Sequence, residues 1–350
     1  MHKEFMLLAL AQAKLGRGFC SPNPSVGAVA VHHNRVIAEA WHQGAGLPHA
    51  EQLVLKQLAQ SSTEVTLYVT LEPCNHWGRT PPCVDAIIAQ GIERVVYAYT
   101  DPNPHVMAQD TPSLLRAKGI EVIHHSLPEI DQFYQSYAHW MRTQRPWVTV
   151  KIAQTLDGKI AGYQGHRIPI SNEVCSEFTH QQRHQSDVIL TTARTLLQDN
   201  PLLNARIAGC PPGSKPLAIL DSNLKVTSKL KATQHAKQVH IYHDEAQQVI
   251  QPNPAWQYIS VSRVQQRLDL DAMLDHLGSL GYHDVWVEAG AGLFGELHRA
   301  QLVNRTYIYV AAKSMGDIGL SLYTDDLGID KAQTIAWQIM GDNAMLTLEW

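Results

Sequence analysis

The sequence predicts an α/β protein with two domains, for three reasons. The chain has 350 residues, more than the roughly 100–200 residues of a typical single domain. Helix-like and strand-like stretches alternate in both halves, as they do in sheets covered by helices on their faces. Hydrophobic residues make up 45% of the chain and charged residues 17%, so each half can form a packed core. One large α/β barrel would also fit this length.

The N-terminal half has a regular order of expected elements. A helix over 4–15 and a hairpin over 28–31 and 36–38 come first. We then expect helices over 50–58, 84–90 and 113–118 and strands over 65–71 and 94–99. Gly91 and Gly119 end the last two of these helices. This alternation predicts a sheet with helices on its faces.

A boundary between two domains is expected at Pro146. A helix over 129–143 runs into Arg145-Pro146, and proline disfavours helical backbone in the residue before it. We therefore assign residues 1–145 and 146–350 to two domains. Strands in the second domain are expected over 147–153, 188–191, 217–221, 239–242, 284–288 and 306–311.

Composition excludes several classes of partner. Twenty-eight Lys and Arg against 32 Asp and Glu give a net charge of −4, so we do not expect nucleic acid to bind. The apolar run 6–11 is far shorter than the roughly 20 residues of a membrane span, so we expect neither a span nor an export signal. Five cysteines, at 20, 74, 83, 175 and 210, form no disulfide framework and favour a reducing cytoplasm.

His49, Glu51, Cys74 and Cys83 suit a catalytic zinc site. One imidazole and two thiolates fill three tetrahedral positions and leave the fourth open for water. Glu51 would then be the acid–base group that carries a proton to a leaving amine, as in zinc deaminases. His49 and Cys83 begin predicted helices, and Cys74 follows a predicted strand. Each residue alone could be an ordinary buried or solvated side chain, but the set in this order favours zinc.

Longer motifs around this set resemble a known family. They are Pro22-Asn23-Pro24-Ser25-Val26-Gly27, His42, Pro48-His49-Ala50-Glu51, Thr70 to Cys83, and Asp101-Pro102-Asn103-Pro104. The chain is similar here to the bifunctional deaminase–reductases of riboflavin biosynthesis, whose two cysteines are likewise separated by eight residues. The resemblance implies a cytidine-deaminase-like three-layer αβα domain that deaminates a diaminopyrimidinone ribotide. It implies one zinc per chain, held by His49, Cys74 and Cys83.

The resemblance also implies which residues line the deaminase substrate pocket. These are Asn23, His42, His76, Arg79 and Asn103. Amides and imidazoles can bind a pyrimidine edge and a sugar, and a cation can bind phosphate. The alternatives are ordinary structural roles. Asn23 and Asn103 could form turns beside prolines, and His76 and Arg79 could lie in a solvated loop.

The second half carries a G-x-G-x-x-G pattern over 290–295, directly after a predicted strand. Such glycines let backbone N–H groups approach a pyrophosphate, but a tight strand-to-helix turn would also need small residues. No acidic residue closes the next strand, so a dinucleotide fold of the usual Rossmann type is not expected. This half instead resembles the family's reductase domain, an α/β fold similar to dihydrofolate reductase. The matching stretches include Lys151-Ile152-Ala153, Thr195 to Leu203 and Val287 to Gly290.

The resemblance implies that NADPH reduces the ribose of the pyrimidine ribotide to a ribityl chain. Positions matching NADPH contacts are Ala153, Ser171, Thr195, Asp199, Ser222, Gly290, Ala291, Gly292, Leu293, Phe294, Gly295 and Glu296. Positions matching substrate contacts are Arg167, Arg183, Leu203, Arg206 and Glu288. Taken singly, Arg183 and Arg206 could be solvated surface charges, and Asp199 could cap the turn before Pro201. We expect a small-molecule substrate and a homo-oligomer, either a dimer or a tetramer.

This half also departs from the family pattern. Pro169 stands where an aromatic Trp is usual, Asn200 where Asp is usual, and Thr192-Ala193 where a glycine turn is usual. Pro169 removes both a stacking surface and a backbone donor. One alternative is therefore a zinc deaminase of another nucleotide with a non-catalytic C-terminal domain. Another is a catalytically silent, zinc-stabilised binding protein, although such a site usually has four protein ligands.

Overall fold

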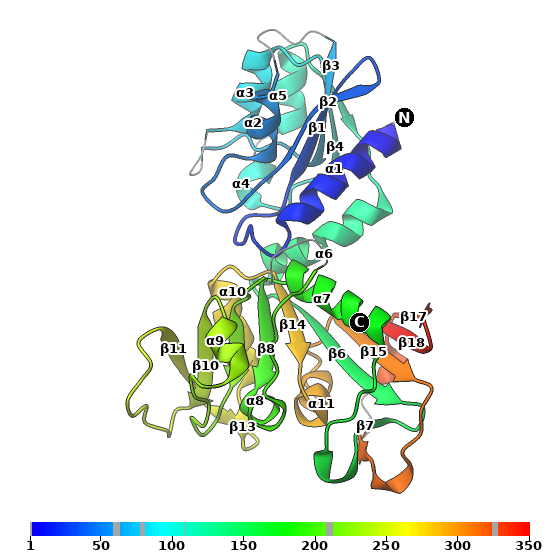
Figure 1. Cartoon of the computed structure of the whole chain (residues 1–350). Helices are drawn as coiled ribbons and strands as arrows, with labels where there is room; N and C mark the ends of the chain where they lie inside the picture. The colour runs from blue at the N-terminus through cyan, green and yellow to red at the C-terminus, as the bar shows by residue number, and fades with distance from the viewer. Residues whose placement is uncertain (1, 59–63, 78–80, 109, 208–212, 324–327) are drawn as a thin grey trace. The chain divides into compact units, whose positions relative to one another are not determined.

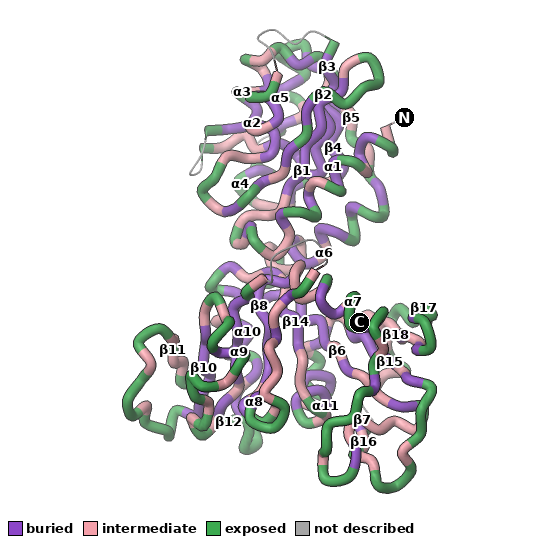
Figure 2. Tube along the Cα trace, viewed as in Figure 1, coloured by how far each residue is buried: buried purple, intermediate pink, exposed green. Residues whose placement is uncertain are grey.

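The computed structural model of the chain describes residues 2–58, 64–77, 81–108, 110–207, 213–323 and 328–350. The chain divides into two compact units, Met1–Gln144 and Arg145–Trp350 (Figure 1). Each unit has its own central sheet and its own hydrophobic core, which appears as the buried tube in Figure 2. Among the described residues, no helix is long and apolar enough to cross a bilayer.

The N-terminal unit is built on a five-stranded sheet with the order β2-β1-β3-β4-β5. Its strands are β1 (Gly27–His32), β2 (Arg35–Trp41), β3 (Val65–Leu71), β4 (Arg94–Tyr99) and β5 (Glu121–His124). β1 is antiparallel to both β2 and β3, whereas β3, β4 and β5 are parallel. All seven residues of β3 are buried, as expected for a central strand covered on both faces.

Helices cover both faces of this sheet. They are α1 (His2–Gly16), α2 (Ala50–Leu55), α3 (Cys83–Gln90), α4 (Pro104–Met107), α5 (Thr111–Ala117) and α6 (Pro128–Thr143). α1 lies on one face, and α2, α3 and α5 lie on the other (Figure 1). Gly91 ends α3 in the left-handed conformation, with a φ of 74°. The predicted three-layer αβα arrangement is confirmed, although the helix predicted over 50–58 ends at Leu55.

The C-terminal unit contains a nine-stranded sheet with the order β11-β10-β9-β8-β14-β6-β15-β18-β17. Its strands are β6 (Trp147–Thr155), β8 (Val188–Thr192), β9 (Leu217–Leu220), β10 (Val239–Asp244), β11 (Trp256–Val261), β14 (Asp284–Glu288), β15 (Arg305–Ala311), β17 (Thr334–Met340) and β18 (Asn343–Glu349). The strands from β11 to β15 are parallel, and β18 and β17 complete the sheet in antiparallel fashion. Two small antiparallel pairs, β7 (Lys159–Ala161) with β16 (Leu320–Ser321) and β12 (Arg263–Val264) with β13 (Arg267–Leu268), lie outside this sheet.

Two apolar clusters, one on each face of the large sheet, form the core of this unit. One includes buried residues of α10 (Leu270–Ser279) and α11 (Ala291–Arg299). The other includes buried residues of α7 (Glu173–Gln185), α8 (Ala193–Asp199) and α9 (Lys231–His235). Side chains along β14 alternate between them, since Val285 and Val287 join the first and Trp286 joins the second. The predicted α/β fold with helices on both faces is confirmed.

The parallel strands of this unit end at one edge of the sheet. Thr192 ends β8 directly opposite Leu220, which ends β9, and Glu288 ends the neighbouring strand β14. Loops that follow parallel strands at such an edge are the usual place for a ligand in an open α/β sheet. The glycine pattern begins in one of these loops, at Gly290 between β14 and α11, and continues into the first turns of α11.

Candidate active sites

The predicted zinc ligands meet at the start of two helices in the N-terminal unit. His49 caps α2, Cys83 begins α3, and Cys74 follows β3. The Nδ1 atom of His49 lies 3.4 Å from Sγ of Cys74 and 3.3 Å from Sγ of Cys83. Zinc bonds of about 2.3 Å to sulfur and 2.0–2.1 Å to nitrogen would place such atoms about 3.6 Å apart around a tetrahedral ion. The donor set therefore fits a zinc ion with one open position.

The protonation of this cluster also fits a metal site. Hydrogen bonding from Cys83 and the nearby His49 lower the pKa of the Cys74 thiol to about 4. The Cys74 contact raises the pKa of His49 to about 9, and hydrogen bonding to Cys74 keeps the pKa of the Cys83 thiol well above its ordinary value. The His49 imidazolium and the Cys83 thiol thus carry protons that a divalent cation would replace.

Glu51 lies beside this cluster in a buried position. Its side chain lines the same cavity as His49 and Cys74, and the residue is only 3% exposed. Its Oε2 atom has no hydrogen-bond partner among the described residues. Burial raises the pKa of this carboxyl group to about 7. A carboxyl group with a pKa near neutrality can both accept and donate a proton, which a hydrolytic reaction at this site would need.

The cavity next to Glu51 has a volume of about 250 Å³. Four of the predicted substrate residues line it, namely Asn23, His42, His76 and Asn103, and Arg79 lies outside the described residues. Asn23 Nδ2 lies 3.1 Å from Nε2 of His42, and Nδ1 of His42 lies 3.1 Å from the carbonyl oxygen of Pro48. Asn103 also caps α4, since its side-chain oxygen accepts from His105 N–H. A turn role and a place in the cavity wall are therefore compatible for Asn103.

Three further polar residues of this cavity were not predicted from the sequence. Asp101 accepts hydrogen bonds from the Asn103 N–H at 2.9 Å and from the Tyr137 hydroxyl at 3.0 Å. Glu72 accepts from the N–H of Asp101 at 3.4 Å. Burial raises the pKa of Asp101 to about 6 and also raises that of Glu72. Strand β3 brings Glu72 close to the end of β4, a contact between distant parts of the chain that no local motif signals.

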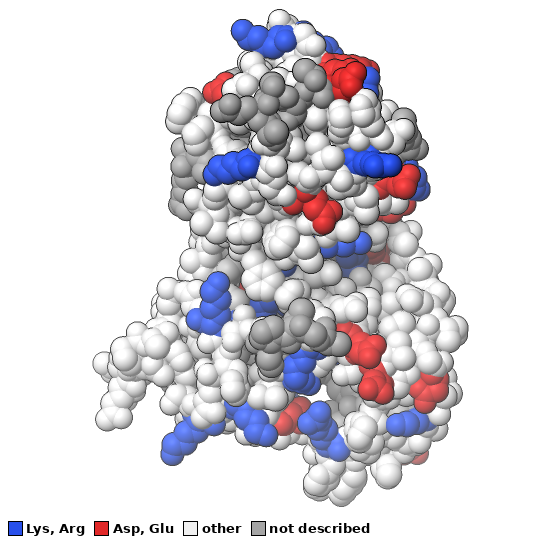
Figure 3. All heavy atoms as spheres, turned by 45° about the horizontal axis from the view of Figure 1, so that its top comes forward, with Lys and Arg blue, Asp and Glu red and all other residues white. Residues whose placement is uncertain are grey.

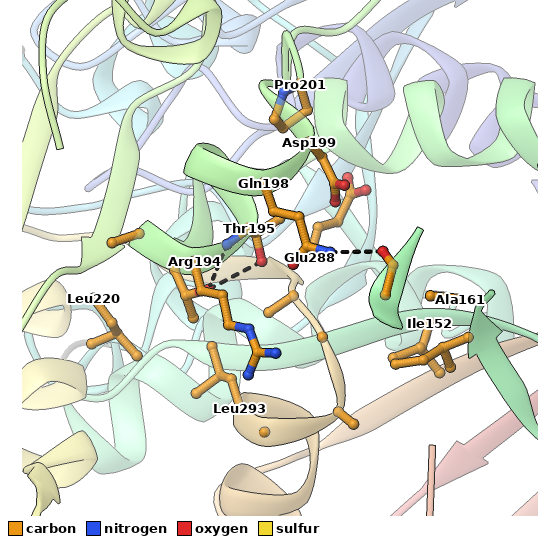
Figure 4. Close-up of a pocket in the computed structure, with 18 of the residues that line it drawn as sticks. Ile152, Ala161, Arg194, Thr195, Gln198, Asp199, Pro201, Leu220, Glu288 and Leu293 are labelled. Carbon is orange, nitrogen blue, oxygen red and sulfur yellow. Dashed lines mark hydrogen bonds between the residues drawn. The ribbon is translucent and has the colours of Figure 1, made fainter. Parts of the chain in front are cut away.

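The C-terminal unit has a larger cavity, of about 1150 Å³, at the carboxyl edge of its parallel strands. Its wall includes most of the predicted NADPH contacts: Ala153, Ser171, Thr195, Asp199, Ser222, Gly290, Ala291, Gly292, Leu293 and Glu296. Thr195 is held by its neighbour, since its N–H donates to Oγ1 of Thr192 at 3.2 Å (Figure 4). The cavity also contains all five predicted substrate contacts: Arg167, Arg183, Leu203, Arg206 and Glu288.

Phe294 and Gly295 do not line this cavity, unlike the rest of the glycine pattern. Phe294 is 1% exposed and packs in the core, and its N–H donates within the helix to Gly290. Gly295 is also buried, and a Cβ atom there would meet the guanidinium of Arg299, one turn further along α11. An α-helix with 3.6 residues per turn turns these two positions away from the face that carries Leu293 and Glu296.

The first two glycines of the pattern fit a bound dinucleotide. Gly290 has a φ of −79°, which any residue adopts, so the turn itself does not require glycine there. Nothing lies within 4 Å of a Cβ atom placed on Gly290 or on Gly292, so side chains there would project into open space. Because these two positions carry no side chain, a phosphate group has room to reach the N–H groups at the start of α11.

Glu288 occupies the centre of a buried ionic network. Its Oε1 atom accepts from Arg183 Nε at 2.5 Å and from Trp286 Nε1 at 2.8 Å. Its Oε2 atom accepts from Arg183 Nη2 at 3.0 Å and from Lys151 Nζ at 3.2 Å. Despite burial, Arg183 and Lys151 hold the pKa of Glu288 well below its usual range. Arg183 is therefore a buried ion-pair partner and no solvated surface charge.

Two departures from the family pattern have a visible structural setting. Pro169 lines the cavity, and its carbonyl oxygen accepts a hydrogen bond from Lys313 Nζ at 2.9 Å. Asn200 ends α8 with a φ of 41°, a left-handed conformation that asparagine tolerates. The side-chain oxygen of Asn200 accepts from the N–H of Lys231 at 2.9 Å. Asn200 therefore fills a defined structural position in this chain.

Comparison with known proteins identifies both units. The family "RibD C-terminal domain" matches residues 146–345, and "Cytidine and deoxycytidylate deaminase zinc-binding region" matches residues 1–99. The riboflavin biosynthesis protein RibD of Actinobacillus pleuropneumoniae is 35% identical over 320 residues, which cover 89% of this chain and 84% of that protein. That of Escherichia coli K12 is 33% identical, covering 91% and 90%.

A solved structure shows the same two-part architecture. It is the diaminohydroxyphosphoribosylaminopyrimidine deaminase/5-amino-6-(5-phosphoribosylamino)uracil reductase of Thermotoga maritima, with a TM-score of 0.85 and 29% identity over 99% of this chain and 98% of that chain. Zinc is the metal of the deaminase family, and NADPH is the cofactor of the RibD reductase domain. The chain belongs to the RibD family of bifunctional deaminase–reductases of riboflavin biosynthesis.

Proposed function

We propose that the N-terminal unit deaminates 2,5-diamino-6-(5-phosphoribosylamino)pyrimidin-4(3H)-one and that the C-terminal unit reduces the resulting aminouracil ribotide. The observation that carries this proposal is the buried Glu51 carboxyl group beside the converging His49, Cys74 and Cys83 side chains. The two activities named for the Thermotoga maritima protein support the choice of substrates.

In the deaminase site, His49, Cys74 and Cys83 hold the zinc ion. Zinc, when bound there, supplies a Lewis acid with one open position that lowers the pKa of water. As the oxygen of the attacking water bonds to C2, Glu51 accepts the water proton and delivers it to the 2-amino group, so that the C–N bond breaks and ammonia leaves. Asn23 and His42 hold one edge of the pyrimidine, because their nitrogen atoms line the cavity and are fixed by each other.

In the reductase site, the first turn of α11 and the adjacent glycines hold the cofactor phosphates. NADPH, when bound there, supplies the hydride that C1′ of the opened sugar accepts. The Arg206 guanidinium binds the ribotide phosphate, and Asn204 orients it, because Nη1 of Arg206 donates to Oδ1 of Asn204 at 2.6 Å. Glu288 stays ionised and positions Lys151 and Arg183 at the cavity wall. Lys151 is a further candidate substrate contact that was not predicted.

Substrate selectivity tests the deaminase assignment. Ammonia release is measured from the diaminopyrimidinone ribotide, from its dephosphorylated riboside and from deoxycytidine monophosphate at equal concentrations. We expect the ribotide to be preferred over deoxycytidine monophosphate by at least about 10³-fold in kcat/KM, since a site built to bind polar groups rejects analogues that lack them. A preference for deoxycytidine monophosphate would overturn the assignment in favour of another nucleotide deaminase.

We further propose that the chain forms a homodimer through the edge strand β17. Ile335, Trp337 and Ile339 are 56%, 63% and 77% exposed on one face of this strand, which lies at the end of the sheet (Figure 2). The strand carries no charged residue, whereas exposed edges of monomers are usually guarded by charges or proline. A second copy related by a two-fold axis can pair β17 with β17 in antiparallel fashion and cover these apolar side chains.

We also expect the protein to act in the cytoplasm. Cys20 and Cys175 are free cysteines, as in a reducing compartment, Cys74 and Cys83 are the proposed zinc ligands, and Cys210 lies outside the described residues. Side chains of both charge signs are interspersed on the face shown in Figure 3, consistent with a net charge of −4.

A further inference from the structure

The cavity of the C-terminal unit has more cations than its own carboxylates can neutralise. Seven Lys and Arg residues line it, against four Asp and Glu residues. Glu288 binds both Lys151 and Arg183, and Glu296 binds Arg267. Among the described residues, no carboxylate lies within ion-pair distance of the remaining four cations, which are Arg167, Arg194, Arg206 and Lys225. The surplus charge indicates that more than one anionic group binds in this cavity.

Two of these four cations, Arg194 and Lys225, are not among the predicted substrate contacts. Arg194 comes two residues after the end of β8, and Lys225 comes five residues after the end of β9. β8 and β9 are adjacent, with Thr192 opposite Leu220. The first turn of α8, which carries Arg194, and the loop after β9, which carries Lys225, therefore leave the same edge of the sheet. Asp221 fixes the loop after β9 by accepting from the N–H groups of Lys225 and Val226 at 2.9 and 2.7 Å. Ser222, three residues before Lys225 in the same loop, also lines the cavity.

The Arg194 side chain lines the cavity together with two leucines. Figure 4 shows its guanidinium group extending toward Leu293, in the first turn of α11, and away from Leu220, at the end of β9. Leu293 follows Gly292 in the first turn of α11, and Leu220 directly precedes the loop that carries Ser222. A dinucleotide whose phosphates contact Gly290 and Gly292, and whose reactive end lies near Glu288, would extend its other end toward this loop. The four strands from β6 to β9 span about 14 Å, since neighbouring strands lie about 4.8 Å apart.

We propose that Arg194 determines the preference for NADPH over NADH by binding the phosphate on the 2′ oxygen of the adenosine ribose. A guanidinium group can donate two hydrogen bonds to one phosphate, which makes it the most suitable side chain for this task. Lys225 supplies the second positive charge, and the Ser222 hydroxyl donates a hydrogen bond to the same phosphate. The leucines beside Arg194 provide an apolar wall for the adenine ring. This inference rests on the proposed function of the cavity as the reductase site.

Arg194 could instead bind the pyrophosphate of the cofactor. The two phosphate groups can be told apart, because NADH has the pyrophosphate but lacks the 2′-phosphate. Binding to the zinc-loaded full chain is measured by calorimetry for NADPH, NADH, adenosine 2′,5′-bisphosphate and adenosine 5′-monophosphate. The variants are Arg194→Ala, Arg194→Lys and Lys225→Ala. Lys229→Ala is the matched control, because Lys229 is exposed on the same loop region and does not line the cavity.

Arg194→Ala should weaken NADPH and the 2′,5′-bisphosphate by about 10–100-fold, the usual effect of losing a charged hydrogen bond, and should change NADH less than about twofold. Arg194→Lys should recover part of this loss, Lys225→Ala should show a smaller loss of the same kind, and Lys229→Ala should match the wild type. Equal losses for NADPH and NADH would overturn the inference and assign Arg194 to the pyrophosphate. Unchanged binding in Arg194→Ala would also overturn it. If the wild type binds neither dinucleotide, the proposed reductase function itself fails.

Discussion

The Arg183 guanidinium and the Glu288 carboxylate form a bidentate ion pair inside the C-terminal unit, with Nε–Oε1 and Nη2–Oε2 distances of 2.5 and 3.0 Å. The two side chains are only 11% and 12% exposed. Lys151 and Trp286 donate to the same carboxylate, so both of its oxygens are fully used. The network connects α7 to the end of β14, where the cavity wall begins. The network therefore contributes both to the stability of the fold and to the shape of the proposed reductase site.

Removing one partner of this pair should destabilise the C-terminal unit strongly. We expect Glu288→Gln and Arg183→Met each to lower the free energy of unfolding by about 3–5 kcal/mol, because each leaves a buried charge without its partner. Urea unfolding monitored by circular dichroism measures this. The double variant should cost less than the sum of the two single variants. Additive losses would show that the two side chains do not interact.

The ion pair also predicts how stability depends on pH. The pKa of Glu288 is held below its ordinary value of 4.5, so its contribution to stability is fully present above that pH and is lost as the pH falls below it. The difference in unfolding free energy between the wild type and Glu288→Gln should therefore be constant from pH 6 to about pH 5 and should shrink toward pH 3. Urea titrations at each pH measure it. A difference that grows on acidification would contradict the assigned sign.

Glu51→Gln should abolish deamination without removing zinc. The amide cannot carry the proton, so ammonia release should fall by at least about 10²-fold, the usual contribution of a general acid–base group. Zinc content by mass spectrometry and NADPH oxidation with the deaminated ribotide serve as controls, and both should match the wild type. Retention of most of the deaminase activity would remove Glu51 from its proposed role.

Cys83→Ser should lower the zinc content of the purified protein well below one per chain. A serine hydroxyl is a weaker ligand for zinc than a thiolate, and metal binding of this kind also stabilises the fold. Cys20→Ser is the matched control, because Cys20 is buried in the same unit and its thiol donates to the carbonyl oxygens of Gly16 and His42. Equal zinc content in both variants would exclude Cys83 as a ligand.

Trp337→Lys should convert a dimer into a monomer. A charge on the exposed apolar face of β17 opposes pairing of this strand with a second copy. Light scattering after gel filtration measures the mass. Ile250→Lys is the control, because Ile250 is 79% exposed and lies away from β17. A wild-type protein that is monomeric at micromolar concentration would contradict the proposed interface.

The zinc cluster could be predicted from the sequence because its residues stand at places that local patterns reveal. His49 and Cys83 begin helices and Cys74 follows a strand, so secondary structure alone brings their side chains to one end of the sheet. Glu72 and Asp101 could not be predicted in the same way. Their proximity depends on the pairing of β3 with β4, which only the folded sheet establishes.

The reductase half shows where pattern matching is limited. A contiguous match over residues 290–296 includes Phe294 and Gly295, but helical rotation places these two away from the cavity. Alternating apolar residues in a strand usually face the core. In β17, however, Ile335, Trp337 and Ile339 are exposed. Arg194 had one available signal, a cation three residues after the strand predicted over 188–191. Its importance becomes visible only with the charges of the whole cavity wall.

The most direct test of a two-activity chain is a single incubation of the zinc-loaded protein with the diaminopyrimidinone ribotide and NADPH. Ammonia release and NADPH oxidation are followed together. We predict both signals, with ammonia appearing first and NADPH consumption following up to an equal amount. Ammonia without NADPH oxidation would contradict the reductase assignment and leave Pro169 as the first residue to restore to Trp. Neither signal from folded, zinc-bound protein would contradict the proposed substrate.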